Sequence, residues 1–205
     1  MSYNLYKIET HHRSPYIVDA VIEIPKGNSA KYEYDPKGFF RYDRSLTSAM
    51  VYPASYGFIP STYADDGDPL DILVYNRTPI DRGTVVECEV VGFLDMEDEG
   101  SRVGLHKDYK ILGVPTSHVR RYKALKDIDP LFLDISKNFF LHYKDLNNKD
   151  VRVFDWHEKE KAWDIINESV NQYNELNKPQ SCFDKFKNLP DDQFEDFLTQ
   201  YCKNK

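Results

Sequence analysis

The sequence predicts an α+β protein that is mainly β, in which short strands close into a small barrel and helices follow. Between residue 16 and about residue 115, short apolar runs are interrupted by Pro and Gly, which is typical of strands joined by turns. After residue 129, apolar residues recur at helical spacing. The chain of 205 residues is long enough for one domain with a sizeable core.

The predicted strands are rich in β-branched and apolar residues, and turn residues separate them. The first strand runs into Pro25-Lys26-Gly27, and Asp35-Pro36-Lys37-Gly38 joins the second and third strands as a hairpin. Many short strands with turns between them favour a closed barrel. Strands are expected at 16–25, 30–35, 38–44, 70–75, 84–96, 109–114 and 149–156.

Two helices are predicted in the C-terminal third. Asp129 and Pro130 form a start signal for a helix over 129–146, and Leu131, Ile135, Phe139 and Leu141 are expected on one of its faces. A second helix is expected over 158–176, with apolar residues at helical spacing. A boundary near Pro179 divides the barrel domain, 1–179, from an extension, 180–205, that is expected to form a short helix.

Composition excludes several classes of protein. The net charge of −7 argues against a general nucleic-acid binder, which needs a basic face. The cysteines, Cys88, Cys182 and Cys202, form no CxxC pair, and no apolar stretch approaches the ~20 residues of a membrane span. A cytoplasmic protein is expected, without a membrane partner. The adjacent His11 and His12 do not share a helix face, so residues 1–15 are interpreted as a solvated entry segment.

Residues 65–71 crowd aspartates at the start of an apolar strand. Gly67 and Pro69 give this loop a defined backbone, and carboxylate oxygens are what hard divalent cations such as Mg²⁺ prefer. An EF-hand is excluded because its fifth and sixth positions would be Leu70 and Asp71. The alternative is an acidic turn, because Asp is common in turns. The aspartates are Asp65, Asp66, Asp68 and Asp71.

Further acidic, basic and phenolic residues are patterned along the chain. Lys31 and Glu33 alternate on one face of a strand, as do Asp108 and Lys110. Each residue alone is most simply a surface charge, but the set together suits a metal–phosphate complex. The remaining members of the set are Glu23, Arg44, Tyr52, Tyr56, Asp98, Glu99, Tyr143 and Lys144.

These motifs resemble the soluble inorganic pyrophosphatases of family I. The resemblance runs from about residue 16 to 176, and DGDPLD (66–71) is its most specific element. It implies a five-stranded OB-like barrel with flanking helices that hydrolyses pyrophosphate to two phosphates. The reaction is expected to use Mg²⁺, with Mn²⁺ or Zn²⁺ as possible substitutes, and direct attack of a metal-activated water without a covalent intermediate. The other matching motifs are VIEIPKG, KYEYD, DR at 43–44, YPASYG, DEG at 98–100, DYK and HYKDL.

The resemblance also implies a role for each matching residue. The implied ligands of the first metal are Asp66, Asp71 and Asp108; Asp71 also serves a second metal, and Asp98 and Asp108 serve metal that arrives with substrate. Glu23 and Glu33 are implied to act through metal-bound water. Asp68 corresponds to the general base, and Tyr56 to a tyrosine near the nucleophile. The implied phosphate ligands are Lys31, Arg44, Lys110, Tyr143 and Lys144, while Tyr52 belongs to a motif without an assigned contact.

The chain departs from the family pattern at two places. Asp98 and Asp108 lie farther apart than in the family, so a longer hairpin tip is expected, with His106 and Lys107 at the tip or the site mouth. The extension after Pro179 passes the usual helical end. A homo-oligomer is expected, either a dimer or a hexamer. The alternatives are an OB-type module for single-stranded nucleic acid, a divalent-dependent phosphatase for another phosphate ester, and an inactive relative.

Overall fold

The structure, a computed structural model, describes residues 4–99, 104–118, 121–147 and 149–177. The described residues up to Tyr173 form one compact unit, and the chain from Asn174 onward is assigned to a second. Of the second unit, only residues 174–177 at the end of the last helix are described. The predicted helix within 180–205 therefore lies outside the described residues. No helix in the described ranges combines the length and apolar character that crossing a membrane requires.

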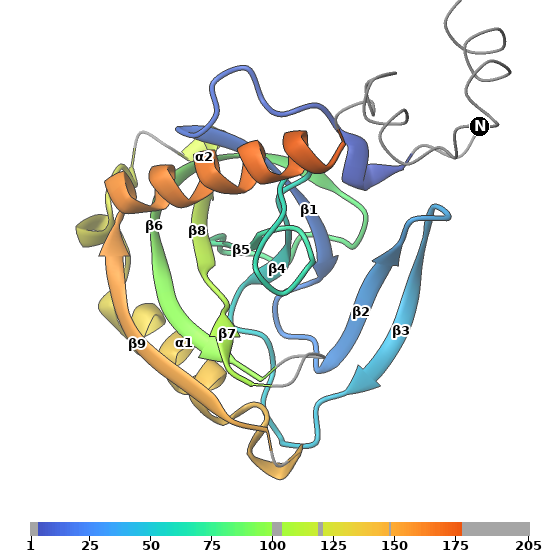
Figure 1. Cartoon of the computed structure of the whole chain (residues 1–205). Coiled ribbons are helices and arrows are strands. Elements are labelled where there is room, and N and C mark those ends of the chain that lie inside the picture. Colours follow the sequence, from blue (N-terminus) through green and yellow to red (C-terminus); the bar gives the residue numbers. More distant parts are fainter. Residues whose placement is uncertain (1–3, 100–103, 119–120, 148, 178–205) are drawn as a thin grey trace, which may run out of the picture. The chain divides into compact units, whose positions relative to one another are not determined.

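Five strands close into a ring, which confirms the predicted five-stranded, OB-like barrel (Figure 1). Within the ring only β5 and β8 are parallel, and the other neighbouring strands are antiparallel. Where β1 meets β4, a Cβ on Gly57 would lie 1.8 Å from the Val21 carbonyl oxygen, so only glycine fits there. In ring order the strands are β1 (Ile17–Ile24), β4 (Ser55–Phe58), β5 (Asp71–Val74), β8 (Lys110–Pro115) and β6 (Val85–Asp98).

The strand β6 extends beyond the ring. Its register shifts between Val90 and Gly92 and again between Leu94 and Met96, and such irregularities bend a strand. Its outer part pairs with β9 (Val151–Glu158) and with the two-residue strand β7 (His106–Lys107). The end of β6 therefore brings Asp98 close to the connection between β7 and β8 (Lys110–Pro115), which carries Asp108.

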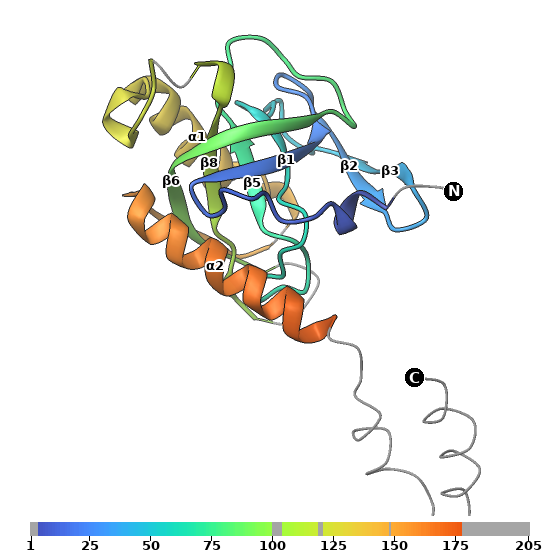
Figure 2. The ribbon, with the colours of Figure 1, turned by 90° about the horizontal axis from the view of Figure 1, so that it is seen from above.

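Two helices and four short 3-10 turns complete the described fold. Asp129 caps α1 (Pro130–His142) by accepting a hydrogen bond from the Leu131 N–H, with Pro130 in the first turn as predicted. The helix α2 (Lys159–Leu176) packs along the sheet through Ala162 and Ile166 (Figure 2). The 3-10 turns are η1 (Leu5–Lys7), η2 (Thr116–His118), η3 (Leu125–Asp127) and η4 (Asp145–Asn147).

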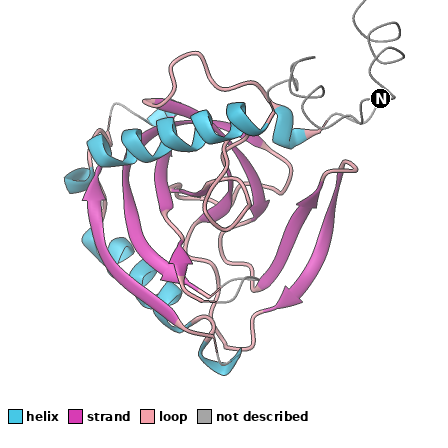
Figure 3. Ribbon diagram, in the orientation of Figure 1, coloured by secondary structure: helices cyan, strands magenta, loops and turns pink. Residues whose placement is uncertain are grey.

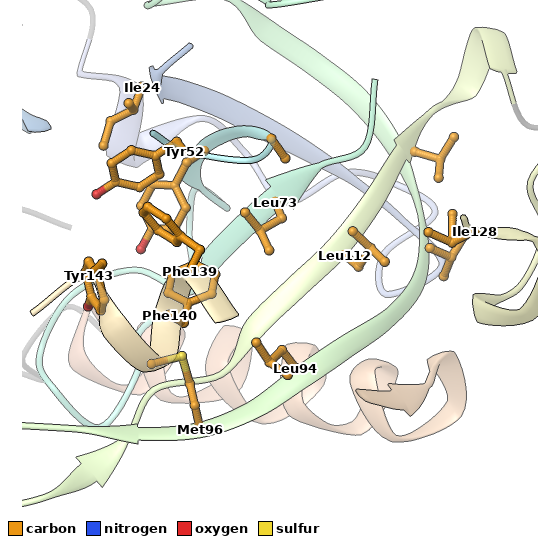
Figure 4. Packing of buried hydrophobic residues seen from close by; sticks show 14 residues of the cluster. Ile24, Tyr52, Leu73, Leu94, Met96, Leu112, Ile128, Phe139, Phe140 and Tyr143 are labelled. Carbon is orange, nitrogen blue, oxygen red and sulfur yellow. The ribbon is translucent and has the colours of Figure 1, made fainter. Parts of the chain in front are cut away.

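Alternate residues of the strands build two apolar clusters. Ile72 and Ile111 join side chains of β1 and α2 in one cluster. Leu73 and Leu112, the next residue in each strand, join α1 in the other (Figure 4). Phe140 and Tyr143, at the end of α1, belong to this second cluster. The core therefore holds the C-terminal end of α1 against β5 and β6, the strands that carry Asp71 and Asp98.

A separate two-stranded sheet stands beside the ring: the predicted hairpin of β2 (Ala30–Asp35) and β3 (Phe39–Ser45) (Figure 3). A lone hairpin is marginally stable in water, so it needs anchors. Tyr34, which is buried, packs against Tyr6 and Phe58, and its N–H donates to Glu23 Oε1 at 2.7 Å. Tyr6 O–H donates to the Tyr34 carbonyl at 2.5 Å.

We expect Tyr6→Phe to loosen the hairpin while leaving the ring intact. The substitution removes one hydrogen bond, typically ~1 kcal/mol, so amide hydrogen exchange in β2 and β3 should accelerate about fivefold if the hairpin opens as a local unit. Mass spectrometry of the exchanged protein measures this. Tyr16→Phe is the control, because Tyr16 is 56% exposed and its ring packs edge-to-face against Trp163 instead. Unchanged exchange in the hairpin would show that Tyr6 is not its anchor.

Several sequence predictions need correction. The helix predicted over 129–146 ends at His142, so Tyr143 and Lys144 follow it. On α1, Leu131 and Ile135 are exposed, whereas Phe139 and Phe140 are buried. The face was wrongly predicted because an apolar residue need not face the core. The strands β4 and β7 were not predicted: β4 is buried throughout and shows no alternation, and β7 has only two residues.

The N-terminal segment is also less solvated than predicted. The His11 side chain is 8% exposed and lies 3.1 Å from Glu87. The carboxylate of Glu87 comes from a distant strand, and it supplies a partner that the local sequence does not reveal.

Candidate active site

A cavity of about 550 Å³ collects every residue to which the family resemblance assigned a role. Its wall is built from the ring strands, the hairpin, the loop before β5 and the end of α1. The predicted residues that line it are Glu23, Lys31, Glu33, Arg44, Tyr56, Asp66, Asp68, Asp71, Asp98, Asp108, Lys110, Tyr143 and Lys144. Tyr52 also lines the cavity, although the sequence assigned it no contact.

The aspartate loop has the defined shape that Gly67 and Pro69 predict. Gly67 adopts a φ of 96°, which glycine tolerates best, and its N–H donates to the Ala64 carbonyl at 3.0 Å. The Asp68 N–H donates to Asp66 Oδ1 at 3.0 Å, a turn closed by an aspartate side chain. The loop therefore serves as a turn and also presents Asp66 and Asp68 to the cavity.

Lys110 holds two carboxylates together at the floor of the cavity. Asp71 and Lys110 are register partners in the parallel pair β5–β8. The Lys110 ammonium donates to Asp71, to Asp108 Oδ1 at 2.5 Å and to the Tyr56 hydroxyl at 3.3 Å. Burial alone would lower the pKa of Lys110, but the charges of Asp108 and Asp71 outweigh it and raise that pKa above its ordinary value.

Asp98 forms a second group with the residues that follow α1. Its Oδ2 accepts hydrogen bonds from the Tyr143 hydroxyl at 2.7 Å and from the Lys144 ammonium. Burial, followed by the charge of Asp98, raises the pKa of Tyr143 well above its usual value, so the phenol stays protonated and donates. The other carboxylate oxygen of Asp98, Oδ1, is buried and has no hydrogen-bond partner among the described residues.

The hairpin contributes cations to the cavity wall. Lys31 Nζ lies 2.7 Å from Glu33 Oε1, as the shared face of these two β2 residues predicts. It also lies 3.7 Å from Asp43 Oδ2 on the neighbouring strand β3. Arg44 pairs with Asp43 and lines the cavity. Lys31 and Arg44 are register partners across the hairpin, so two positive charges face the cavity from neighbouring strands.

Three carboxyl groups of the cavity, those of Glu23, Asp66 and Asp108, carry raised pKa values. Burial raises the pKa of Glu23 to about 8, although the Tyr34 N–H opposes the shift. Burial likewise raises the pKa of Asp108 to about 6 and that of Asp66 above its ordinary value, with the charge of Asp71 adding to both. A cation placed among these groups would lower all three pKa values, because it favours the charged form of each carboxylate.

The donor set suits a hard divalent cation. Carboxylate oxygens are the ligands that Mg²⁺ prefers, and the unpaired Asp98 Oδ1 is an acceptor with no donor. In the described part of the chain, no three acidic, histidine or cysteine side chains already converge to hold an ion. At Asp71 and Asp108 the Lys110 ammonium takes up oxygens that an ion would use. The residues fit a divalent ion by their chemistry.

Sequence reasoning assigned no role to several residues of the wall. Tyr6 comes from the N-terminal segment, and only the tertiary fold brings it there. His106 and Lys107, expected at the tip or the mouth, do line the cavity. Asn147 and Lys149 also line the cavity. Their position just after the motif HYKDL is the only feature of the sequence that could have predicted this. The other wall residues without an assigned role are Tyr34, Phe58, Pro69, Glu99 and Phe140.

Comparison with known proteins points to one family. Residues 20–174 match the family model described as inorganic pyrophosphatase. The inorganic pyrophosphatase of Campylobacter jejuni is 44% identical over 165 residues, which is 78% of this chain and 93% of that protein. The crystal structure of the Thermus thermophilus inorganic pyrophosphatase aligns with a TM-score of 0.78 at 38% identity, covering 84% of this chain and 99% of that one. A Helicobacter pylori inorganic pyrophosphatase structure aligns with a TM-score of 0.75 at 37% identity, covering 82% and 99%.

Proposed function

The chain belongs to the inorganic pyrophosphatase family and is a pyrophosphate-hydrolysing enzyme, and we propose that it depends on Mg²⁺ and uses direct attack by water. The observation that carries the proposal is the convergence, on one polar cavity, of every residue to which the family resemblance assigns a role. Pyrophosphate is a compact double anion, and its oxygens need both cations and hydrogen-bond donors. The cavity offers carboxylates for metal and ammonium, guanidinium and phenol groups for phosphate.

Metal binding is assigned to the carboxylates. Asp66, Asp71 and Asp108 would hold the first ion, with Asp71 shared with a second; Asp98 and Asp108 would serve metal that accompanies the substrate. Glu23 and Glu33 would act through water. When bound, such ions neutralise phosphate charge and make water a better nucleophile near neutral pH. Mn²⁺ and Zn²⁺ are the substitutes that we expect to support turnover.

Asp68 would accept the proton of the attacking water as general base. It lies on the exposed side of the loop and lines the cavity, so hydrogen-bond reach to that water is what the role requires. Tyr56 would lie beside the nucleophile. Burial raises the pKa of Tyr56 well above its usual value, so its phenol remains a donor. No side chain of the cavity needs to form a covalent bond with phosphate.

The basic side chains would stabilise the leaving phosphate. Negative charge grows on the leaving group in the transition state, and fixed donors aimed at it lower the barrier. Lys31 and Arg44 approach from the hairpin, while Tyr143 and Lys144 approach from the end of α1. The remaining phosphate ligand, Lys110, comes from β8.

The purified protein should release phosphate rapidly from pyrophosphate in the presence of Mg²⁺ and stop when EDTA is added. A colorimetric phosphate assay measures this, and Mn²⁺ and Zn²⁺ replace Mg²⁺ in parallel. Adenosine triphosphate and a phosphomonoester are the control substrates, because a phosphatase for other esters would prefer them. Equal release with EDTA would refute metal dependence. Faster release from the control substrates would refute the proposed specificity.

We keep two broader expectations as part of the proposal. The chain would act in the cytoplasm, as its cysteine pattern suggests, and as a homo-oligomer. Large exposed apolar side chains on α1, such as Leu131 at 64% exposure and Ile135 at 49%, support association of copies.

A further inference from the structure

The short strand β7 places His106 directly opposite Asp98. Two register pairs join β7 to β6: Glu97 with Lys107, and Asp98 with His106. Opposite residues of an antiparallel pair share a face of the sheet, with Cβ atoms ~4.5–5.5 Å apart. The contact of Lys107 Nζ with Glu97 Oε1 at 3.2 Å agrees with this register. Asp98 and His106 both line the active-site cavity.

This register pair also holds two of the three buried side-chain nitrogen or oxygen atoms that have no hydrogen-bond partner in the described residues. They are Asp98 Oδ1 and His106 Nε2, and the third atom, Trp163 Nε1, lies on α2. The Asp98 side chain is only 6% exposed. Leaving a buried polar atom unpaired costs free energy, so two such atoms on paired residues need an explanation.

The two atoms have the chemistry of metal ligands. A carboxylate oxygen is always an acceptor, and a neutral imidazole nitrogen without its proton offers a lone pair. Asp98 Oδ2 is already occupied by Tyr143 and Lys144, which leaves Oδ1 as the oxygen for a further partner. One cation between the two side chains would satisfy both atoms.

The nitrogen atom decides which cation this position favours. Mg²⁺ takes oxygen ligands and gives up its waters reluctantly. Imidazole suits first-row transition metals, and Co²⁺ and Zn²⁺ bind nitrogen more tightly than Mg²⁺ does. An oxygen-only set at this wall would favour Co²⁺ and Zn²⁺ over Mg²⁺ less strongly than a set with one nitrogen.

We propose that His106 and Asp98 form a mixed nitrogen–oxygen site for a transition-metal ion, so that His106 shifts the metal preference of this enzyme away from Mg²⁺. The inference rests on the proposed function in one respect, because Asp98 is there assigned to metal that accompanies the substrate. His106 lies in the segment between Asp98 and Asp108, where the sequence departs from the family pattern. The site is therefore a property of this chain's own residues.

Co²⁺ binding to the full-length protein, without substrate, tests the proposal. In proton NMR of the Co²⁺-loaded wild type we expect a strongly shifted, solvent-exchangeable resonance from the N–H of a coordinated imidazole. His106→Gln should remove that resonance. In calorimetric titrations it should weaken Co²⁺ binding by at least the ~10–100-fold that loss of an outer-shell partner of a metal ligand costs. Mg²⁺ binding should weaken much less, because Mg²⁺ does not depend on nitrogen.

His157→Gln is the matched control, because His157 lies near a carboxylate, Asp95, at 3.8 Å but does not line the cavity. It should keep the shifted resonance and the Co²⁺ affinity. His106→Phe keeps a ring of similar size and guards against a folding defect, which near-ultraviolet circular dichroism detects. An absent resonance in the wild type, or a resonance that survives both His106 variants, would overturn the proposal.

Phosphate release with Mg²⁺, measured on the same wild-type sample, separates the two possible failures. Release of phosphate without the imidazole resonance would overturn this metal site and leave the proposed function standing. The imidazole resonance without release would support the site and overturn the Mg²⁺-dependent reaction.

Discussion

Asp68→Asn should lower kcat for pyrophosphate by roughly 10²–10⁴-fold, the usual contribution of a general base. Asparagine keeps the size of the side chain but accepts no proton. The Asp68 N–H, which closes the turn with Asp66 Oδ1, belongs to the backbone and is unaffected. Steady-state kinetics with Mg²⁺ measure the loss, and calorimetry should show metal binding close to that of the wild type.

Asp65→Asn is the matched control for this substitution. Asp65 lies in the same acidic stretch, but it lines a smaller neighbouring pocket of about 120 Å³ and not the active-site cavity. It should leave kcat within about twofold of the wild type, as expected of a carboxylate outside general-base reach.

Asp71→Asn should instead weaken metal binding, because it removes a proposed ligand. Unchanged turnover in Asp68→Asn would reject the base, and unchanged metal affinity in Asp71→Asn would reject that ligand.

Lys110→Met should destabilise the metal-free protein by about 3–5 kcal/mol, the typical cost of removing one partner from a buried ion pair. Lys110 is 2% exposed, and its ammonium contacts both Asp71 and Asp108. Methionine fills a similar volume but leaves two neighbouring carboxylates without their counter-charge. Urea unfolding in EDTA at neutral pH measures the loss. Added Mg²⁺ should recover part of it, because a ligand that binds only the folded state stabilises that state.

The destabilisation should also depend on pH. Burial holds the pKa of Asp108 at about 6 in the folded protein, even though Lys110 opposes that shift, against an ordinary value of 3.8. Removing Lys110 should therefore raise that pKa further. An acid with a raised folded pKa favours the folded state while protonated, and this stability is lost as pH rises through that pKa. The loss of unfolding free energy in Lys110→Met, relative to the wild type, should be small at about pH 5 and largest at about pH 8.

Lys137→Met provides the comparison on the surface. Lys137 pairs with Asp155 at 2.8 Å, but the Asp155 side chain is 81% exposed, and such pairs contribute only ~0–1 kcal/mol. If Lys110→Met lowered the free energy of unfolding no more than Lys137→Met does, the stability of the buried cluster would not depend on the Lys110 ammonium. A deficit that stayed constant between the two pH values would exclude the charge of Asp108 as its cause.

Most strands and both helices were predictable because each follows from a local pattern. The alternation in 16–25 and the β-branched run in 84–96 correspond to β1 and β6. The start signal at Asp129 and Pro130 corresponds to the first turn of α1. The strand β4 escaped detection because its four residues are all buried and show no apolar–polar alternation, and β7 escaped because it has only two residues.

The composition of the site was also predictable, whereas its internal contacts were not. The motif DGDPLD and the paired spacings of Lys31 with Glu33 and of Asp108 with Lys110 identified residues that do line one cavity. The contact of Lys110 with Asp71 depends on the parallel pairing of β5 and β8, which lie 39 positions apart at these residues. Sequence spacing carries no information about such a pairing.

Neighbouring residues alone account for the alternation of the strands, the shape of the aspartate loop, the start of α1 and the set of charged side chains. Which atoms of that set find a hydrogen-bond or ionic partner depends on the three-dimensional fold. The fold buries Glu23 against the Tyr34 N–H, places Tyr6 in contact with the hairpin, and sets His106 opposite Asp98 with two unpaired atoms. The physical reason is that desolvation and partner choice depend on residues distant in the chain, which only folding brings together.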